Sequence, residues 1–192
     1  FYNHVIIVTE ESAEVTYVEN DLSTTSGEDN QLNIVSEVIA GANSNVTYGS
    51  VDYLDKGFTG HIIRRGSADA DASINWALGL MNEGSQIIDN TTNLIGDRST
   101  SALKSVVVGT GDQKINLTSK IVQYGKETDG YILKHGVMKE NASSVVWCCL
   151  NVSKSHFLNF VLSGFGISKV SVNFNAFLRN SVIQEDSLCA LE

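Results

Sequence analysis

The chain has 192 residues, of which 42% are hydrophobic, and carries a formal net charge of −9 at pH 7. This length and apolar content are enough for one domain with a sizeable core, or for one piece of a larger protein. The negative charge argues against non-specific binding to nucleic acid, which requires clustered lysine and arginine. No apolar run is long enough to cross a bilayer, and the first ten residues lack the basic segment of a signal peptide. They are typical of a strand already under way, so we expect the native N-terminus to lie upstream.

Two residue counts are informative about the fold class. Proline is absent, whereas an average usage of roughly 5% predicts about ten. Because proline interrupts the hydrogen-bonded ladder of a sheet, its absence favours a chain made mostly of paired strands. The three cysteines are an odd number and all lie near the C-terminal end, which argues against a disulfide framework and favours a reducing compartment.

Short runs rich in β-branched and aromatic residues follow one another along the chain and predict strands. In chain order the predicted strands are residues 5–8, 14–18, 34–39, 45–51, 60–65, 72–78, 86–95, 105–108, 115–124, 131–137 and 144–150. Residues 9–13, 40–44 and 66–71 predict turns, and the acidic segment 21–30 predicts a solvated loop.

Two segments allow a helix as well as a strand. Residues 77–81 do not alternate cleanly, but Gly79 makes a helix there costlier by roughly 1 kcal/mol than alanine would, so we predict a strand. Residues 157–161 are compatible with a helix. They lie beyond Val146, in a segment that holds all three cysteines and five of the seven phenylalanines.

The strand pairs recur at a loose spacing. Equivalent positions fall at steps of 31, 28, 31 and 27 residues, near Val15, Val46, Ile74, Ser105 and Ile132. A β-sandwich and a β-solenoid both place many short strands at such a spacing. Ser, Thr and Asn occupy both parities of several runs, and parallel stacking tolerates these residues in ladders, which modestly favours the solenoid. Periodicity alone gives the β-sandwich and the β-solenoid nearly equal support.

Residues with potential metal or redox chemistry are scattered. Cys148 and Cys149 are adjacent and lack the Cys-x₂-Cys spacing of metal sites, and Cys189 is the only other thiol. We therefore interpret the cysteines as buried apolar residues. Surface or structural roles are expected for the histidines, which form no ligand-spacing motif: His4, His61, His135 and His156.

Other short motifs also have plain interpretations. Gly109-Thr110-Gly111-Asp112 lacks the Gly-Lys-Ser/Thr ending of a phosphate loop, and we expect a turn. Asp69, Asp71 and the pair Glu28-Asp29 match no calcium-loop pattern and are expected to be solvated. Arg64-Arg65 is the one small basic cluster; we expect a solvated strand end, with binding to an acidic group of a partner as the alternative.

Asn-x-Ser/Thr sequons begin at five positions: Asn45, Asn90, Asn116, Asn141 and Asn151. A chain this rich in Asn, Ser and Thr is expected to form such sequons by chance. Together these motifs assign no catalytic residue and no metal ligand, and residues that bind a cofactor stay unknown.

Longer strings of residues carry a more specific signal. They are VTYVEN at residues 15–20, IVSEVIA at 34–40, VTYG at 46–49, WALGLMN at 76–82, TSKI at 118–121 and YILKHGVMK at 131–139. In residue identity and in order along the chain they resemble the SufB/SufD family of iron–sulfur cluster assembly proteins, in its SufD branch of the Gram-positive type. The resemblance covers about residues 1–145.

The resemblance implies a right-handed parallel β-helix. It also implies a scaffold subunit without catalysis of its own, which pairs in the cytoplasm with a SufB-like subunit and the ATPase SufC. That complex handles the iron–sulfur cluster, so no cofactor is expected in this chain alone.

Residues 146–192 depart from the family pattern. The later histidine-containing segment of the family, and its C-terminal helical contact with SufC, have no counterpart here, so no functional residue is carried over. For this segment a continued solenoid and a mis-assigned reading of the sequence both remain open.

Two further functions fit a β-solenoid. A secreted polysaccharide-active enzyme would need acidic and basic residues along one face, and an adhesin-like interaction solenoid would be exported and glycosylated. Neither nucleic acid nor membrane is an expected partner. The open edge of a solenoid makes a homodimer plausible.

Overall fold

The computed structural model describes residues 1–23, 29–152, 158–165 and 170–174, with side chains described at 1–23 and 29–146. Within these residues the chain forms thirteen strands and no helix. The strands are β1 (Tyr2–Thr9), β2 (Glu14–Leu22), β3 (Asn30–Ala40), β4 (Asn45–Tyr53), β5 (Phe58–Ala68), β6 (Ser73–Leu80), β7 (Gln86–Leu94), β8 (Thr100–Gly109), β9 (Lys114–Gln123), β10 (Asp129–Met138), β11 (Ser143–Val152), β12 (Leu158–Phe165) and β13 (Val170–Phe174).

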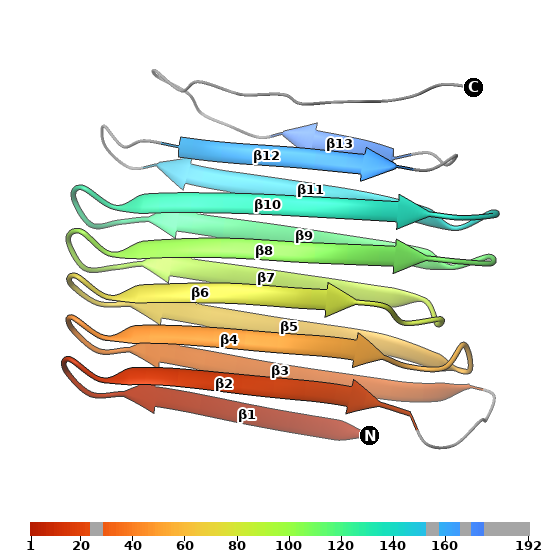
Figure 1. Ribbon diagram of the computed structural model, residues 1–192, viewed down its shortest axis with the longest axis horizontal. Coiled ribbons are helices and arrows are strands. Elements are labelled where there is room, and N and C mark those ends of the chain that lie inside the picture. The colour runs from red at the N-terminus through yellow and green to blue at the C-terminus, as the bar shows by residue number, and fades with distance from the viewer. Residues whose placement is uncertain (24–28, 153–157, 166–169, 175–192) are drawn as a thin grey trace.

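The strands form two parallel sheets that wind into a solenoid. The odd-numbered strands make a 7-stranded sheet, called sheet A here, and the even-numbered strands make a 6-stranded sheet, sheet B. The chain runs along sheet A in one direction, turns a corner, and returns along sheet B while advancing one level, in a right-handed sense (Figure 1). Parallel pairing throughout confirms the predicted β-helix over the sandwich, whose sheets are antiparallel.

Register between the coils follows the predicted repeat in its first two steps only. Val15, Val46 and Ile74 pair in one row of sheet B, as predicted. Ile74 then pairs with Ser101, and Ser105 pairs with Leu78 instead. The prediction was wrong here because residues 100–104 lack a strong β-branched pattern, so the predicted strand began too late.

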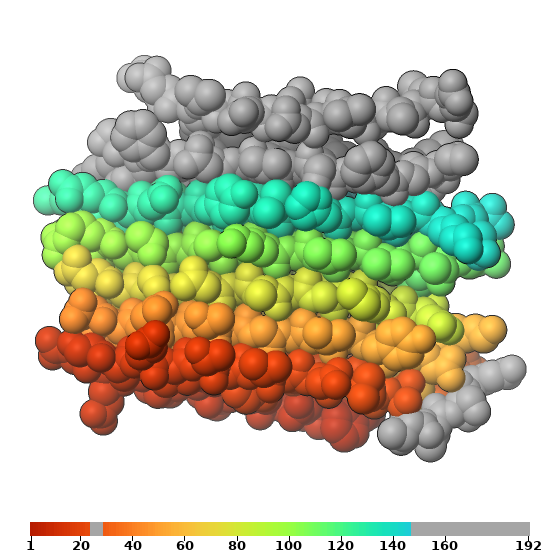
Figure 2. All heavy atoms as spheres, in the orientation of Figure 1, coloured from red at the N-terminus to blue at the C-terminus, as the bar shows by residue number. Residues whose placement is uncertain are grey.

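Alternation of burial holds along the described strands even where polarity does not alternate. In β4 and β6, every second residue is buried between the sheets. The residues that blur the sequence pattern are polar ones at inward positions, such as Ser50 and Ser105. Space-filling atoms of successive coils lie in flat layers directly on one another (Figure 2).

The core is built from columns of inward side chains. One column of sheet B stacks aromatic rings, with centroids 5.2 Å apart for Tyr17 and Tyr48 and 5.0 Å apart for Tyr48 and Trp76. The indole N–H of Trp76 donates to Thr92 Oγ1 of sheet A at 3.0 Å. Gly66 makes room for this indole, because a Cβ there would lie 3.1 Å from Trp76 Cζ2.

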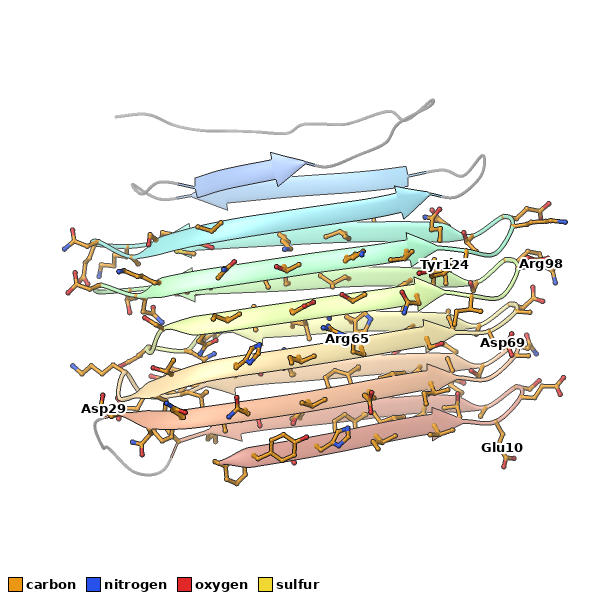
Figure 3. All side chains as sticks on the ribbon, turned by 180° about the vertical axis from the view of Figure 1, so that it is seen from behind. Glu10, Asp29, Arg65, Asp69, Arg98 and Tyr124 are labelled. Atoms are coloured by element: carbon orange, nitrogen blue, oxygen red, sulfur yellow. The ribbon has the colours of Figure 1, made fainter. Side chains whose placement is uncertain are left out.

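From β1 to β10, a stacked turn forms the corner between each odd strand and the next even strand. One residue per corner has a positive φ. Short polar residues adopt this conformation most readily, but longer residues also occupy it here. These residues are Ser12, Asn43, Asp71, Arg98 and Glu127. The first four donate their backbone N–H to a carbonyl of the next coil. The charged side chains at these corners point outward (Figure 3).

Several local predictions can be compared with these elements. Residues 110–113 form the turn between β8 and β9, with Gly111 at a φ of 63°. The turn predicted at 109–112 is confirmed except for Gly109, the last residue of β8. Asp29, Asp69 and Asp71 are exposed in turns, while Glu28 lies outside the described residues. The helix considered for residues 157–161 is wrong for 158–161, which belong to β12 and pair with β10.

Strands continue past residue 145, beyond the residue strings that carried the predicted resemblance. β11 pairs in register with β9 on one side and with β13 on the other. Among the described residues, no helix is long and apolar enough to span a membrane.

Replacing Trp76 by alanine should lower the free energy of unfolding by about 3–5 kcal/mol, because it leaves a cavity in the aromatic column and an unpaired Thr92 hydroxyl. Urea titration followed by circular dichroism measures the change. Ala77→Ser, at the neighbouring outward and exposed position, is the matched control and should change stability little. A loss below about 1 kcal/mol for Trp76→Ala would contradict this account of the core.

Candidate functional site

A cluster of charged and polar side chains lies inside the first coils, between the two sheets. Alternation along β2, β3, β4 and β5 turns these residues inward, although they are polar. We call the cluster the Arg64 network. It consists of Glu19, Asp21, Ser36, Tyr48, Ser50, Asp52 and Arg64.

Arg64 is the centre of this network and is fully buried. Its Nη2 donates to Ser50 Oγ at 2.9 Å and to both carboxylate oxygens of Asp52 at 3.2 Å. Its guanidinium carbon lies 5.9 Å from the centre of the Tyr48 ring, within the range of a cation–π contact. Burial alone would lower the pKa of Arg64, but Asp52 and Tyr48 outweigh it and raise the pKa, so the guanidinium stays charged.

The position of Arg64 corrects the prediction of a solvated Arg64-Arg65 cluster. Arg64 has the inward parity of Ile62 and Gly66, and its partner Asp52 comes from the opposite sheet. Only Arg65 is on the surface, where it forms a two-point ion pair with Asp89 at 2.9 and 3.0 Å (Figure 3).

Tyr48 links the guanidinium to a second carboxylate. Its hydroxyl donates a short hydrogen bond to Glu19 and lies 2.9 Å from Ser36 Oγ. Both Tyr48 and Glu19 are buried. Burial raises the pKa of the Tyr48 hydroxyl well above its usual range, so the phenol stays neutral and acts as the donor to Glu19.

The network contains more acid than base. Three carboxyl groups, those of Glu19, Asp21 and Asp52, face the single guanidinium of Arg64. Burial, followed by the nearby charges of Glu19 and Asp52, raises the pKa of Asp21 to about 7, against a smaller opposing effect of Arg64. Asp21 therefore holds a proton part of the time at neutral pH.

This arrangement favours a structural or proton-binding role over a metal site. Its strongest contacts are internal, because the carboxylates of Glu19 and Asp52, which a cation would need, are already bound by Tyr48 and Arg64. Among the residues that the structure describes, no group of His, Cys, Asp or Glu is arranged to hold a metal ion.

The histidines considered in the sequence are not brought together. His4 lies on the outer face of sheet A, 2.9 Å from the Glu37 carboxylate, and His61 is exposed on the same face two strands further. His135 is exposed in β10, on the outer face of sheet B. His156 and the side chains of the cysteines lie outside the described residues.

The sequons differ in exposure. Asn45, Asn116 and Asn141 are exposed, whereas Asn90 is fully buried and faces the interior. Asn90 is therefore inaccessible to a glycosylating enzyme in the folded chain. Asn151 belongs to β11, and its side chain lies outside the described part of the chain.

Sequence reasoning missed Glu19, Tyr48 and Asp52 as members of a site. A signal was present, because Asp52 shares its parity with Val46 and Tyr48, and Arg64 shares its parity with Ile62. A charged residue in register with core residues is rarely left unpaired. The partner of such a charged residue can be identified only once the strands that face it are known.

The fold and this interior define a protein of the parallel β-solenoid class, and comparisons with known proteins narrow the class to one family. The family model described as "SUF system FeS cluster assembly, SufBD core domain" matches residues 1–155. The chain therefore belongs to the SufB/SufD family, as the resemblance of its strand sequences predicted.

Two curated relatives agree with this assignment. The chain is 54% identical over 145 residues to the iron–sulfur cluster assembly protein SufD of Bacillus subtilis, which covers 75% of this chain and 33% of that protein. It is 25% identical over 163 residues to a SufBD family iron–sulfur cluster assembly protein of Trieres chinensis, over 79% of this chain and 33% of that protein. The chain thus spans about a third of the length of these relatives.

The raised pKa of Asp21 predicts a pH-dependent stability. Between the ordinary aspartate pKa of 3.8 and the folded value of about 7, the folded state binds more protons than the unfolded state. The free energy of unfolding should therefore fall as pH rises through this window. Asp21→Asn removes the effect and should be about 1 kcal/mol more stable than the wild type at pH 8, after allowance for the partial exposure of the group.

Urea titrations at pH 4, 6 and 8 measure this difference, which should nearly vanish at pH 4. The exposed residue Asp129 provides the control, because Asp129→Asn removes one negative charge from the surface. Equal pH profiles for Asp21→Asn and the wild type would show that Asp21 is not the group responsible.

Proposed function

We propose that this chain is the core of a scaffold subunit in iron–sulfur cluster assembly, which acts through contacts with other proteins and performs no catalysis of its own. The match of residues 1–155 to the SufBD core domain carries this proposal. A solenoid supports it physically, because its two sheets form rigid and extended faces held in one register.

The proposed partners are a SufB-like subunit and a SufC-like ATPase, in the cytoplasm. Apolar side chains exposed on both outer faces support a role in protein contacts, since clustered exposed apolar groups are typical of interaction surfaces. On sheet B and its margin they include Val18, Val51, Tyr53, Met81, Val106 and Val137. ATP hydrolysis would belong to the SufC-like subunit, and the iron–sulfur cluster would be a cargo of the assembled complex.

Two charged pairs on the outer face of sheet A are consistent with a non-catalytic role. General acid–base chemistry needs a carboxyl, imidazole or amine free to reach a substrate. The outer face of sheet A instead pairs Arg65 with Asp89 and His4 with Glu37. These pairs give no specific support to a polysaccharide-active enzyme.

Co-purification of the full-length parent protein with its SufB-like and SufC-like counterparts tests the proposal. We expect the tagged parent to retain both partners and the complex to activate an apo iron–sulfur reporter enzyme. The Trp76→Ala variant of the parent, with its core disrupted, should retain less of both. ATPase activity should follow the SufC-like subunit and be absent from the isolated chain.

A parent protein that folds but retains neither partner would overturn the scaffold proposal. Turnover of a substrate by the purified chain alone would overturn its non-catalytic part.

A further inference from the structure

A column of polar side chains continues inside the solenoid beyond the Arg64 network. Arg64, Asn90 and Ser119 are paired in register on the neighbouring strands β5, β7 and β9 of sheet A. On sheet B, Ser105 has the inward parity of Leu103 and Val107 and belongs to the row of Ser50, which contacts Arg64 across the interior. Arg64, Asn90, Ser105 and Ser119 are all at most 3% exposed.

Much of the hydrogen-bonding capacity of these four residues is not used by the protein. Nε and Nη1 of Arg64, both amide atoms of Asn90, and the hydroxyls of Ser105 and Ser119 are buried without a hydrogen-bond partner in the described structure. Buried polar atoms are almost always paired with protein or with ordered water. Leaving several unpaired at one place would cancel much of the stability of an ordinary domain.

Neighbouring groups of the column do not pair directly in this structure. A serine and an asparagine in register on neighbouring strands can do so, as Ser73 and Asn45 do at 2.6 Å. Ser119 and Asn90 are in register in the same way, but their side-chain polar atoms have no partner among the described residues. One water molecule has the right size to bridge two such groups.

We propose that this column, formed by Arg64, Asn90, Ser105 and Ser119, binds a file of ordered water molecules inside the solenoid. The column offers donors on Arg64, an acceptor and donors on Asn90, and hydroxyls that do both. A buried water typically makes two to four hydrogen bonds, and these groups supply partners of both kinds. Asp52 already balances the charge of Arg64, so Arg64 itself needs no further counter-ion.

The water file has a structural consequence beyond the scaffold role. The waters would supply hydrogen-bond partners for the inward polar groups of the middle coils. Asp52 and Ser50 already do this for Nη2 of Arg64. Polar residues at inward positions could then persist in the core without each needing a protein partner. The bridges would also join successive coils, because each would span strands adjacent in sheet A.

Magnetic relaxation dispersion of water ¹⁷O, measured on the folded chain, tests this proposal. It detects waters that stay bound inside a protein far longer than surface waters. We expect a long-lived component in the wild type, and at least a twofold smaller one in the double variant Asn90→Leu with Ser119→Ala. Asn116→Leu, at an exposed outward position of β9, is the matched control and should keep the wild-type amplitude.

A crystal structure of the wild-type chain at high resolution provides a second test that needs no variant. Ordered waters within hydrogen-bond distance of Asn90 and Ser119 would support the proposal. Direct protein partners for these atoms, or a wild-type dispersion without a long-lived component, would overturn it. A double variant that folds and keeps the full dispersion amplitude would overturn it as well.

Discussion

The parallel register between coils is the constraint on which the rest of this structure depends. Once β3, β5, β7 and β9 are paired, residues of the same parity fall into columns along the solenoid axis. A shift of one residue in any strand would exchange its inward and outward side chains. In β5 such a shift would place Arg65 inside and remove Arg64 from Asp52.

The Arg64 network makes that register specific. Apolar residues on both sides of a strand distinguish poorly between two registers, and β5 has Ile62 facing inward beside Ile63 on the other face. A buried charge distinguishes them strongly, because losing its partner is far costlier than moving a methyl group. We infer that the network contributes more to specificity than to net stability, since a buried ion pair adds little net stability. For a proposed scaffold, whose contact faces must keep one shape, this is a useful property.

Strand positions and the solenoid could be foreseen from sequence, although by different routes. The β-branched runs located most strands, and the Gly109–Asp112 turn followed from its glycines. Periodicity left the sandwich and the solenoid nearly even, and the resemblance of residues 76–82 and 131–139 to a known family decided between them. The family comparison then confirmed that resemblance and extended it to residues 1–155.

The interior site could not be foreseen because its partners lie far apart in the chain and on different sheets. Arg64 looked like a surface residue, since an arginine beside another arginine at a strand end is usually solvated. Its buried position follows from parity, which the surrounding polar residues obscured, and from Asp52 on the facing sheet. The same polar inward positions blurred the repeat at Ser105. In these coils, the register position of a residue determines whether its side chain faces the interior more than its polarity does.

A double-mutant cycle on Arg64 and Asp52 tests the central role of this network most directly. Urea titrations would compare Arg64→Met, Asp52→Leu and the two together with the wild type. Each single change should reduce the free energy of unfolding by about 3–5 kcal/mol because it leaves a buried charge unpaired, and the double variant should recover most of that loss. Single losses that simply add in the double variant would contradict the account, because they would show that the two side chains do not act as a pair.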